Sequence, residues 1–251
     1  MIAALAERLA AELARLYLAP GAVAPHALAA HLLGQQLVTV SLVTTDGQVR
    51  ALALPFERSR EDGEDGHWQR LCAVANAMQG ELGLPAPAVS IDGEKGYRLW
   101  LSFAAPVPAS DVARLLDGLR AAGMPQLDLA TAAAPVALPP CLHPRTGKWA
   151  AFVHPGMGGS FAEEPGLDMQ PPLTGQVTFL EGLESIAPEQ LRHALKTLDG
   201  LRTTPHATPA PAPAMTNGGA GLLLRDATLE DIVAHLQAKG IEPTFRFLAP
   251  K

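Results

Sequence analysis

The sequence predicts a mixed α+β domain in which helices flank a mostly antiparallel β-sheet, and three observations indicate this class. Amphipathic helical segments alternate with short strand segments up to residue 202. Two pairs of strand segments are joined by Asp-Gly dipeptides, Asp46-Gly47 and Asp92-Gly93, which are typical of hairpins. Hydrophobic residues make up 48% of the 251 residues, so the chain can bury a sizeable core.

The expected helices follow from apolar residues at helical spacing, with proline near the start and glycine at the end of several segments. They span residues 2–18, 25–33, 67–82, 110–122 and 188–202, and Ser110 is the expected N-cap of the fourth. Runs rich in β-branched residues predict strands at 37–44, 49–54, 89–91 and 97–103. Pro55 is expected to stop the second strand. Short extended pieces are expected at 127–129, 136–138, 149–153 and 176–180.

The composition changes at Thr203 and divides the chain. Residues 203–220 are rich in proline, alanine and glycine, which predicts an extended linker. Residues 221–251 read as a small strand-helix-strand, βαβ-like element. An element of this size does not fold alone, so it is expected to dock on the main domain, residues 1–202, or on another protein.

The bulk properties limit the function classes. A formal net charge of −6 argues against tight sequence-independent binding of nucleic acid, which normally depends on a basic excess. Cys72 and Cys141 form no disulfide framework, and Cys141 with His143 lacks a second ligand pair for zinc. The charged N-terminal segment is unlike a signal peptide, and no apolar run is long enough for a membrane span, so the predicted location is the cytoplasm.

Three segments, taken together, carry a family resemblance. They are His31–Gly34 with the hairpin to Leu54, then Ser90–Phe103 with the helix start that follows it, and Leu138–Phe152. In this order they resemble the motifs of the archaeo-eukaryotic primase (primase-polymerase) superfamily. The resemblance covers roughly residues 28–185. It implies a primase-polymerase-like core of β-hairpins and a mostly antiparallel sheet flanked by helices.

The chain departs from this family where the family holds its catalytic metals. The second strand of the hairpin ends in Asp-x-Asp in the family, and here Leu52 and Leu54 stand in its place. Leucine cannot bind the paired Mg²⁺ or Mn²⁺ of two-metal phosphoryl transfer. Glu57 follows three residues later, in a direction that the strand pattern does not fix. Where the family has a phosphate-contacting histidine, this chain has Arg98, which can clamp a phosphate but stays charged.

The resemblance implies that a set of polar residues converges on a phosphate- or nucleotide-binding site. The set is Lys95, Arg98, His143, Arg145, Thr146 and Lys148. No acidic residue occurs between Asp128 and Glu163, which favours a local basic patch. The alternative is an ordinary solvated turn at Pro144–Gly147. No metal or other cofactor is expected, with Mg²⁺ or Mn²⁺ relevant only to a surviving active site.

Three hypotheses for function follow. The first is a catalytically degenerate primase-like domain that binds a nucleotide or single-stranded nucleic acid without efficient nucleotidyl transfer. The second is an active nucleotidyltransferase that uses relocated carboxylates, with Glu57, Asp92 and Asp128 as candidates. The third is a non-enzymatic scaffold that binds a protein through its surface or through residues 221–251. The first is preferred.

Overall fold

The computed structural model describes residues 2–59, 63, 65–123, 127 and 129–203. For residues 202 and 203 only the backbone is described. It is a mixed α+β fold with an antiparallel sheet of five strands in the order β2-β4-β3-β7-β6. The strands span β2 (Gln48–Glu57), β3 (Ala88–Ile91), β4 (Gly96–Pro108), β6 (Cys141–Leu142) and β7 (Trp149–Val153). A second, two-stranded ribbon pairs β1 (Thr39–Val40) with β5 (Val136–Ala137).

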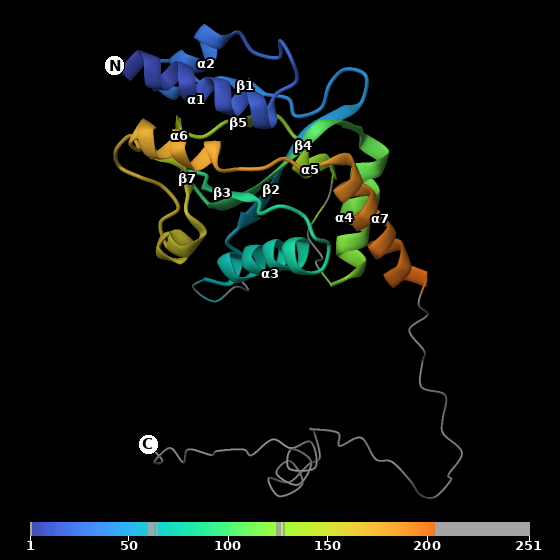
Figure 1. Ribbon diagram of the computed structural model, residues 1–251. Coiled ribbons are helices and arrows are strands. Elements are labelled where there is room, and N and C mark those ends of the chain that lie inside the picture. The colour runs from blue at the N-terminus through green and yellow to red at the C-terminus, as the bar shows by residue number, and fades with distance from the viewer. Residues whose placement is uncertain (1, 60–62, 64, 124–126, 128, 204–251) are drawn as a thin grey trace, which may run out of the picture. The chain divides into compact units, whose positions relative to one another are not determined.

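Helices cover both faces of the sheet (Figure 1). The first face carries α1 (Ile2–Tyr17), α2 (Pro25–Leu32) and α6 (Leu173–Glu181), together with the β1–β5 ribbon. The second face carries α3 (Gly66–Gly80), α4 (Ala109–Ala121), the short α5 (Leu129–Ala132) and α7 (Pro188–Thr203). A 3₁₀ turn, Pro155–Phe161, follows β7. The expected α+β class and antiparallel sheet are confirmed.

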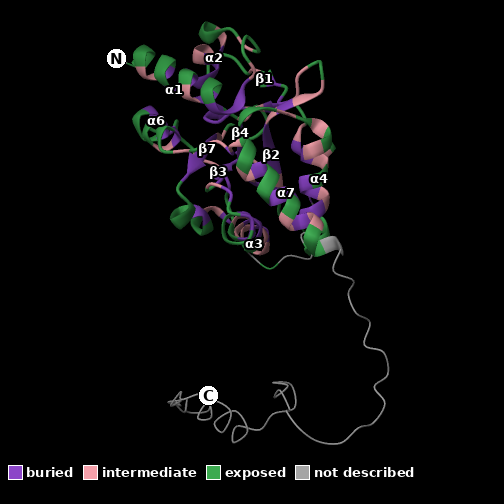
Figure 2. Ribbon diagram, turned by 45° about the vertical axis from the view of Figure 1, so that its right-hand side comes forward, coloured by how far each residue is buried: buried purple, intermediate pink, exposed green. Residues whose placement is uncertain are grey.

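Strand alternation sorts the core into two clusters, one on each face. On β4, Leu99 and Leu101 join the cluster beneath α3, α4 and α7, whereas Trp100 joins the cluster beneath α1, α2 and α6. The neighbouring strands follow the same rule, because successive side chains of a strand point to opposite faces. Figure 2 shows the central parts of the strands buried, while the helices are buried along the side that meets the sheet and exposed along the other.

The long helices and the Asp-Gly turns lie where the sequence places them. Gly47 and Gly93 have φ of 75° and 82°, in the left-handed region that glycine adopts without strain. Leu9, Leu13 and Leu16 on α1 are fully buried, as their helical spacing predicts. Helix α7 starts at Pro188, in agreement with the preference of proline for the first turn.

Other expectations are wrong in detail. Residues 176–180 belong to helix α6 rather than to an extended piece, and Leu129 begins α5. The expected strand at 37–44 is reduced to β1, which pairs with β5, while Val43 forms only an isolated bridge to Val49. Ser110 lies inside the first turn of α4, because the helix begins at Ala109 with Pro108 as its N-cap.

Pro55 does not stop β2, which continues to Glu57. Strand β2 is the edge strand of the sheet and pairs with β4 alone within it. Arg58 donates its N–H toward β4, to Lys95 O. Because the N–H groups of successive residues in an antiparallel strand point alternately toward and away from the partner, the nitrogen of Pro55 faces away from β4. A proline at such a position costs no ladder hydrogen bond.

The chain divides between Pro205 and His206. The expected linker at 203–220, apart from the backbone of Thr203, and the expected element at 221–251 lie outside the described residues, as does Asp128. Within the part of the chain that is described, no helix is both long enough and apolar enough to cross a membrane.

Candidate functional site

A pocket of about 270 Å³ opens on the first face of the sheet, between the strands and the β1–β5 ribbon. Its floor comes from β3, β4 and β7, and its opposite wall from the segment 135–139 and from Leu37. Three of the six residues expected at a phosphate site line it: Lys95, Arg98 and His143. The carboxylates of Glu57, Asp92 and Glu94 line it as well.

The three segments that carry the family resemblance meet around this pocket. His31 of the first segment is 1% exposed and connects α2 to the start of the third segment. Its Nδ1 accepts a hydrogen bond from the Val38 N–H at 3.0 Å, so its Nε2–H donates to Leu138 O at 2.8 Å. Burial lowers the pKa of His31, which therefore stays neutral in the folded protein. The second segment, from Ser90 to Arg98, supplies part of the floor.

Arg98 is the central feature of the pocket. It lies on β4 one residue from buried Leu99, so alternation directs it to the same face as Trp100 and Ser90. Its side chain is half-buried, and among the described residues it forms no hydrogen bond and no ion pair. A guanidinium that is partly withdrawn from water and lacks a counter-ion favours a bound anion.

The neighbouring charges are already engaged. Lys95 forms a loose pair with Glu57, with 3.6 Å between Nζ and Oε2, and both side chains are about half exposed at 54% and 49%. Asp92 Oδ1 accepts the backbone N–H groups of Glu94, Lys95 and Gly96 at 2.8, 2.8 and 3.1 Å. Asp92 therefore holds the β3–β4 turn, as an aspartate in such a turn commonly does.

His143 connects the β6–β7 hairpin to the β3–β4 turn. Its Nε2 lies 3.1 Å from Glu94 Oε2, and its Nδ1 lies 3.3 Å from Thr146 Oγ1. The single hydroxyl proton of Thr146 is donated to Gly93 O at 2.7 Å, so Thr146 Oγ1 can only accept from His143. These contacts hold the His143 ring between Glu94 and Thr146, so His143 adds rigidity to the pocket wall.

The other three expected residues lie at the rim or outside the pocket. Arg145 pairs with Glu94, and Thr146 is occupied by the contacts described above. Lys148 pairs with Glu164 and lies 4.0 Å from Asp168, and it does not line the pocket. The structure therefore brings Lys95, Arg98 and His143 together, and assigns Arg145, Thr146 and Lys148 to holding the hairpin in place.

The positions matched to the metal-binding Asp-x-Asp do not fit a two-metal site. Leu52 and Leu54 are buried in the core of the second face, on the opposite side of the sheet from Arg98. On the pocket face, β2 presents Ala51, Ala53 and Pro55, none of which binds a metal. Glu57 is the one carboxylate that β2 directs to the pocket. In the described part of the chain, no group of three or more His, Cys, Asp and Glu side chains is arranged to hold a metal ion.

The sequence does not predict the apolar residues of the pocket. Leu37 and Leu142 are large hydrophobic side chains that remain 48% and 38% exposed, and both line the pocket. Pro135, Pro139 and Pro144 extend this apolar wall. A ligand with an anionic group and a flat apolar group suits such a lining. Exposed leucines and prolines give no sequence signal, because they are equally common in ordinary loops.

Cys141 and Trp149 are next in the chain to Leu142 and Ala150, which line the pocket. Trp149 packs against Gly34, where an added Cβ would lie 2.9 Å from the indole, so it fixes the loop after α2 and is not a free stacking platform. Cys141 is 5% exposed, and burial raises the pKa of its thiol to about 12, which keeps it protonated and unreactive.

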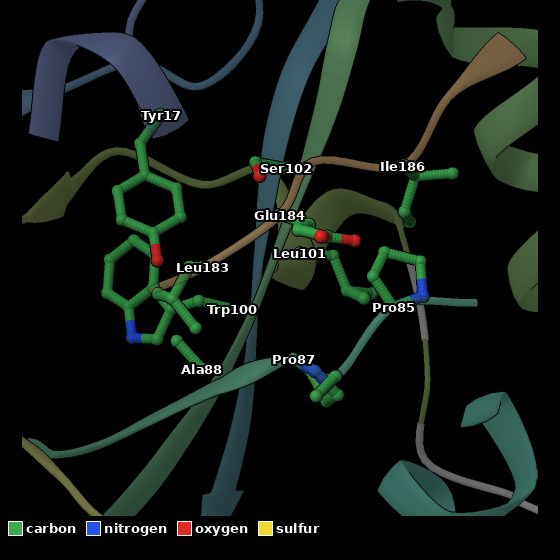
Figure 3. Close-up of a pocket in the computed structure, with 11 residues that line it drawn as sticks. Tyr17, Pro85, Pro87, Ala88, Trp100, Leu101, Ser102, Leu183, Glu184 and Ile186 are labelled. Atoms are coloured by element: carbon green, nitrogen blue, oxygen red, sulfur yellow. The ribbon is translucent and has the colours of Figure 1, made fainter. Parts of the chain in front are cut away.

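A second depression beside Tyr17 and Trp100 is too small for a ligand (Figure 3). Its volume of about 10 Å³ is close to the space that one water needs. Pro85, Pro87 and Leu183 close it. The pocket around Arg98 is therefore the better candidate site.

Comparisons with known proteins do not assign this chain to a family. No protein-family model matches the sequence, and no curated protein matches it. The primase-polymerase resemblance accordingly rests on the three sequence segments alone.

Proposed function

We propose that this chain is a diverged primase-polymerase-like domain that binds the phosphate groups of a nucleotide in the pocket around Arg98 without efficient nucleotidyl transfer. The single observation that carries the proposal is the half-buried Arg98 guanidinium, which forms no ion pair with any described residue. Lys95 adds positive charge beside it, and His143 lines the same pocket. Leu37 and Leu142 offer an apolar surface for a base or sugar.

The carboxylates support binding over catalysis. Asp92 is occupied by three backbone N–H groups, and Glu94 by His143 and Arg145. Glu57 is the least constrained of the three. A single carboxylate holds a catalytic metal weakly, so efficient two-metal transfer is not expected. The pocket volume of about 270 Å³ and the net charge of −6 favour a mononucleotide over a long single strand.

The test is a thermal melt of the full chain with millimolar ATP or deoxynucleoside triphosphates, with and without Mg²⁺ or Mn²⁺. A ligand at 100 times its Kd adds about 2.7 kcal/mol, a shift that a melt resolves. We expect stabilisation by the triphosphates but not by adenosine, because the phosphates carry the interaction. The shift should disappear in Arg98→Met and persist in Arg120→Met, an exposed arginine of α4 that pairs with Asp117.

A second arm separates the competing functions. Primer extension with Mn²⁺ should give no product, whereas extension that is lost in Glu57→Ala would indicate a relocated active site. Short single-stranded DNA that stabilises the chain more than ATP would favour a nucleic-acid ligand. A flat response to every ligand would reject the proposal and favour the scaffold.

A further inference from the structure

A groove lies at the other end of β4 from the candidate site, and it contains an arginine that forms no ion pair with any described residue. It consists of two pockets of about 370 and 600 Å³ that share Arg15, Arg50 and Ala104. The first pocket is walled by the loop after α1, and the second by the segment from Leu183 to Gln190. Nothing in the candidate phosphate site involves these residues.

A break in strand register places Arg50 in the groove. Val49 pairs with Val107 and Ala51 with Ser102, so the single residue Arg50 faces the four residues 103–106 of β4. Such irregularities redirect a side chain out of the regular alternation. Here Arg50 reaches the C-terminal end of α1, where its Nη2 donates to the main-chain oxygen of Arg15.

The charge of Arg50 is not balanced. Arg15 is paired with Glu12 at 2.7 Å and also donates to Leu180 O at 3.0 Å. For Arg50, by contrast, no ion pair is formed with any residue that the structure describes, and its Nη1 is buried without a hydrogen-bond acceptor there. Burial lowers the pKa of Arg50, and the nearby charge of Arg15 lowers it further. An unpaired, partly buried guanidinium is costly unless an anion compensates it.

The net charge and the lining define the anion. Because Glu12 neutralises Arg15, the first pocket holds one excess positive charge, that of Arg50, which matches a monoanion better than a phosphate dianion. Glu184 and Glu189 line the second pocket and disfavour an anion there. Leu18, Pro20, Val23 and Pro106 make the first pocket largely apolar. We propose that the first pocket of this groove binds a carboxylate carried on a small apolar group, either a free acyl amino acid or the C-terminus of an apolar peptide.

The test is calorimetric titration of the full chain with N-acetyl-leucine. We expect saturable binding that weakens at least tenfold in Arg50→Met and is unchanged in Arg98→Met, which alters only the other site. N-acetyl-leucinamide, which lacks the carboxylate, should not bind, and inorganic phosphate should bind more weakly. A tripeptide with a free C-terminal leucine separates the two sources, since tighter binding than N-acetyl-leucine would assign the site to a peptide end. No binding of N-acetyl-leucine, equal binding by Arg50→Met, or tighter binding of phosphate would overturn the proposal.

A second pair of variants keeps the test independent of how Arg50→Met folds. Ala104 is exposed and lines both pockets, so Ala104→Glu supplies a carboxylate within the protein beside Arg50. We expect Ala104→Glu to raise the melting temperature and to abolish binding of N-acetyl-leucine. Ala104→Gln introduces a side chain of the same shape as Glu without its charge, and should do neither. Binding that survives unchanged in Ala104→Glu would contradict the proposed site.

Discussion

Arg98 lies directly opposite Pro55 in the register of β4 and β2. Both residues belong to the pocket face of the sheet, while their neighbours Leu54 and Leu99 belong to the buried core of the other face. The family resemblance aligns the missing carboxylates with Leu52 and Leu54, whose side chains point away from the pocket. A carboxylate introduced at Leu54 would therefore point into the core, whereas one introduced at Pro55 would point to the pocket face.

The first prediction concerns these two positions. Leu54→Asp places a carboxylate in a side-chain position that is 1% exposed, and should lower the free energy of unfolding by about 4 kcal/mol or more. Pro55→Asp lies on the pocket face in a half-buried position and should change stability by less than about 1 kcal/mol. Urea denaturation followed by circular dichroism measures both. Equal losses in the two variants would contradict the assigned facing.

The second prediction is a pH dependence that comes from His31. Because burial lowers its pKa below the ordinary value of 6.5, the unfolded chain binds a proton that the folded chain rejects. The stabilisation is complete above pH 6.5 and declines as the pH falls below this value toward the folded pKa. Melting temperatures from pH 7.5 to pH 5 should therefore fall less steeply in His31→Gln than in the wild type. The control is His26→Gln, at an exposed position of the same helix, and parallel profiles in wild type and His31→Gln would sink this prediction.

The third prediction concerns Gln176, which completes the sheet edge from helix α6. Its Oε1 accepts the Phe152 N–H and its Nε2 donates to Phe152 O, both at 2.9 Å. Gln176→Leu leaves both buried backbone groups unpaired and should cost about 2–5 kcal/mol in chemical denaturation. Gln176→Glu keeps an acceptor for the Phe152 N–H and loses the donor, so an intermediate loss is expected. A stability for Gln176→Leu equal to that of the wild type would show that the two bonds contribute little.

The fourth prediction concerns the close approach of Gly158 to Trp68. A Cβ at Gly158 would lie 2.0 Å from the indole, which cannot move freely because it packs on Tyr97 with ring centroids 5.1 Å apart. Tyr97 in turn donates its hydroxyl to Gly158 O at 2.7 Å. Gly158→Ala should cost about 1–3 kcal/mol, measured by thermal melts. Gly159→Ala, whose Cβ would remain 3.5 Å from Trp68, is the matched control and should be close to neutral.

Local sequence determined much of the secondary structure. The leucines of α1 at helical spacing, the Asp-Gly turns and the proline at the start of α7 act over a few residues, so their outcome can be read from the chain alone. Lys95, Arg98 and His143 are expected from the sequence to lie together, and all three line one pocket.

Tertiary structure decided the rest. Residues 176–180 form a helix because Val177 and Leu180 pack on the first-face cluster, a long-range contact that outweighs their strand-like composition. Pro55 is tolerated because β2 is an edge strand, and the short strand β1 pairs with β5, far away in sequence. Which expected site residues line the pocket, and which hold the hairpin, depends on ion pairs such as Lys148–Glu164 and on strand register. Spacing along the chain determines which side chains share one face of a helix or strand. Which way that face points, and which charges it meets, are determined only when distant segments pack together.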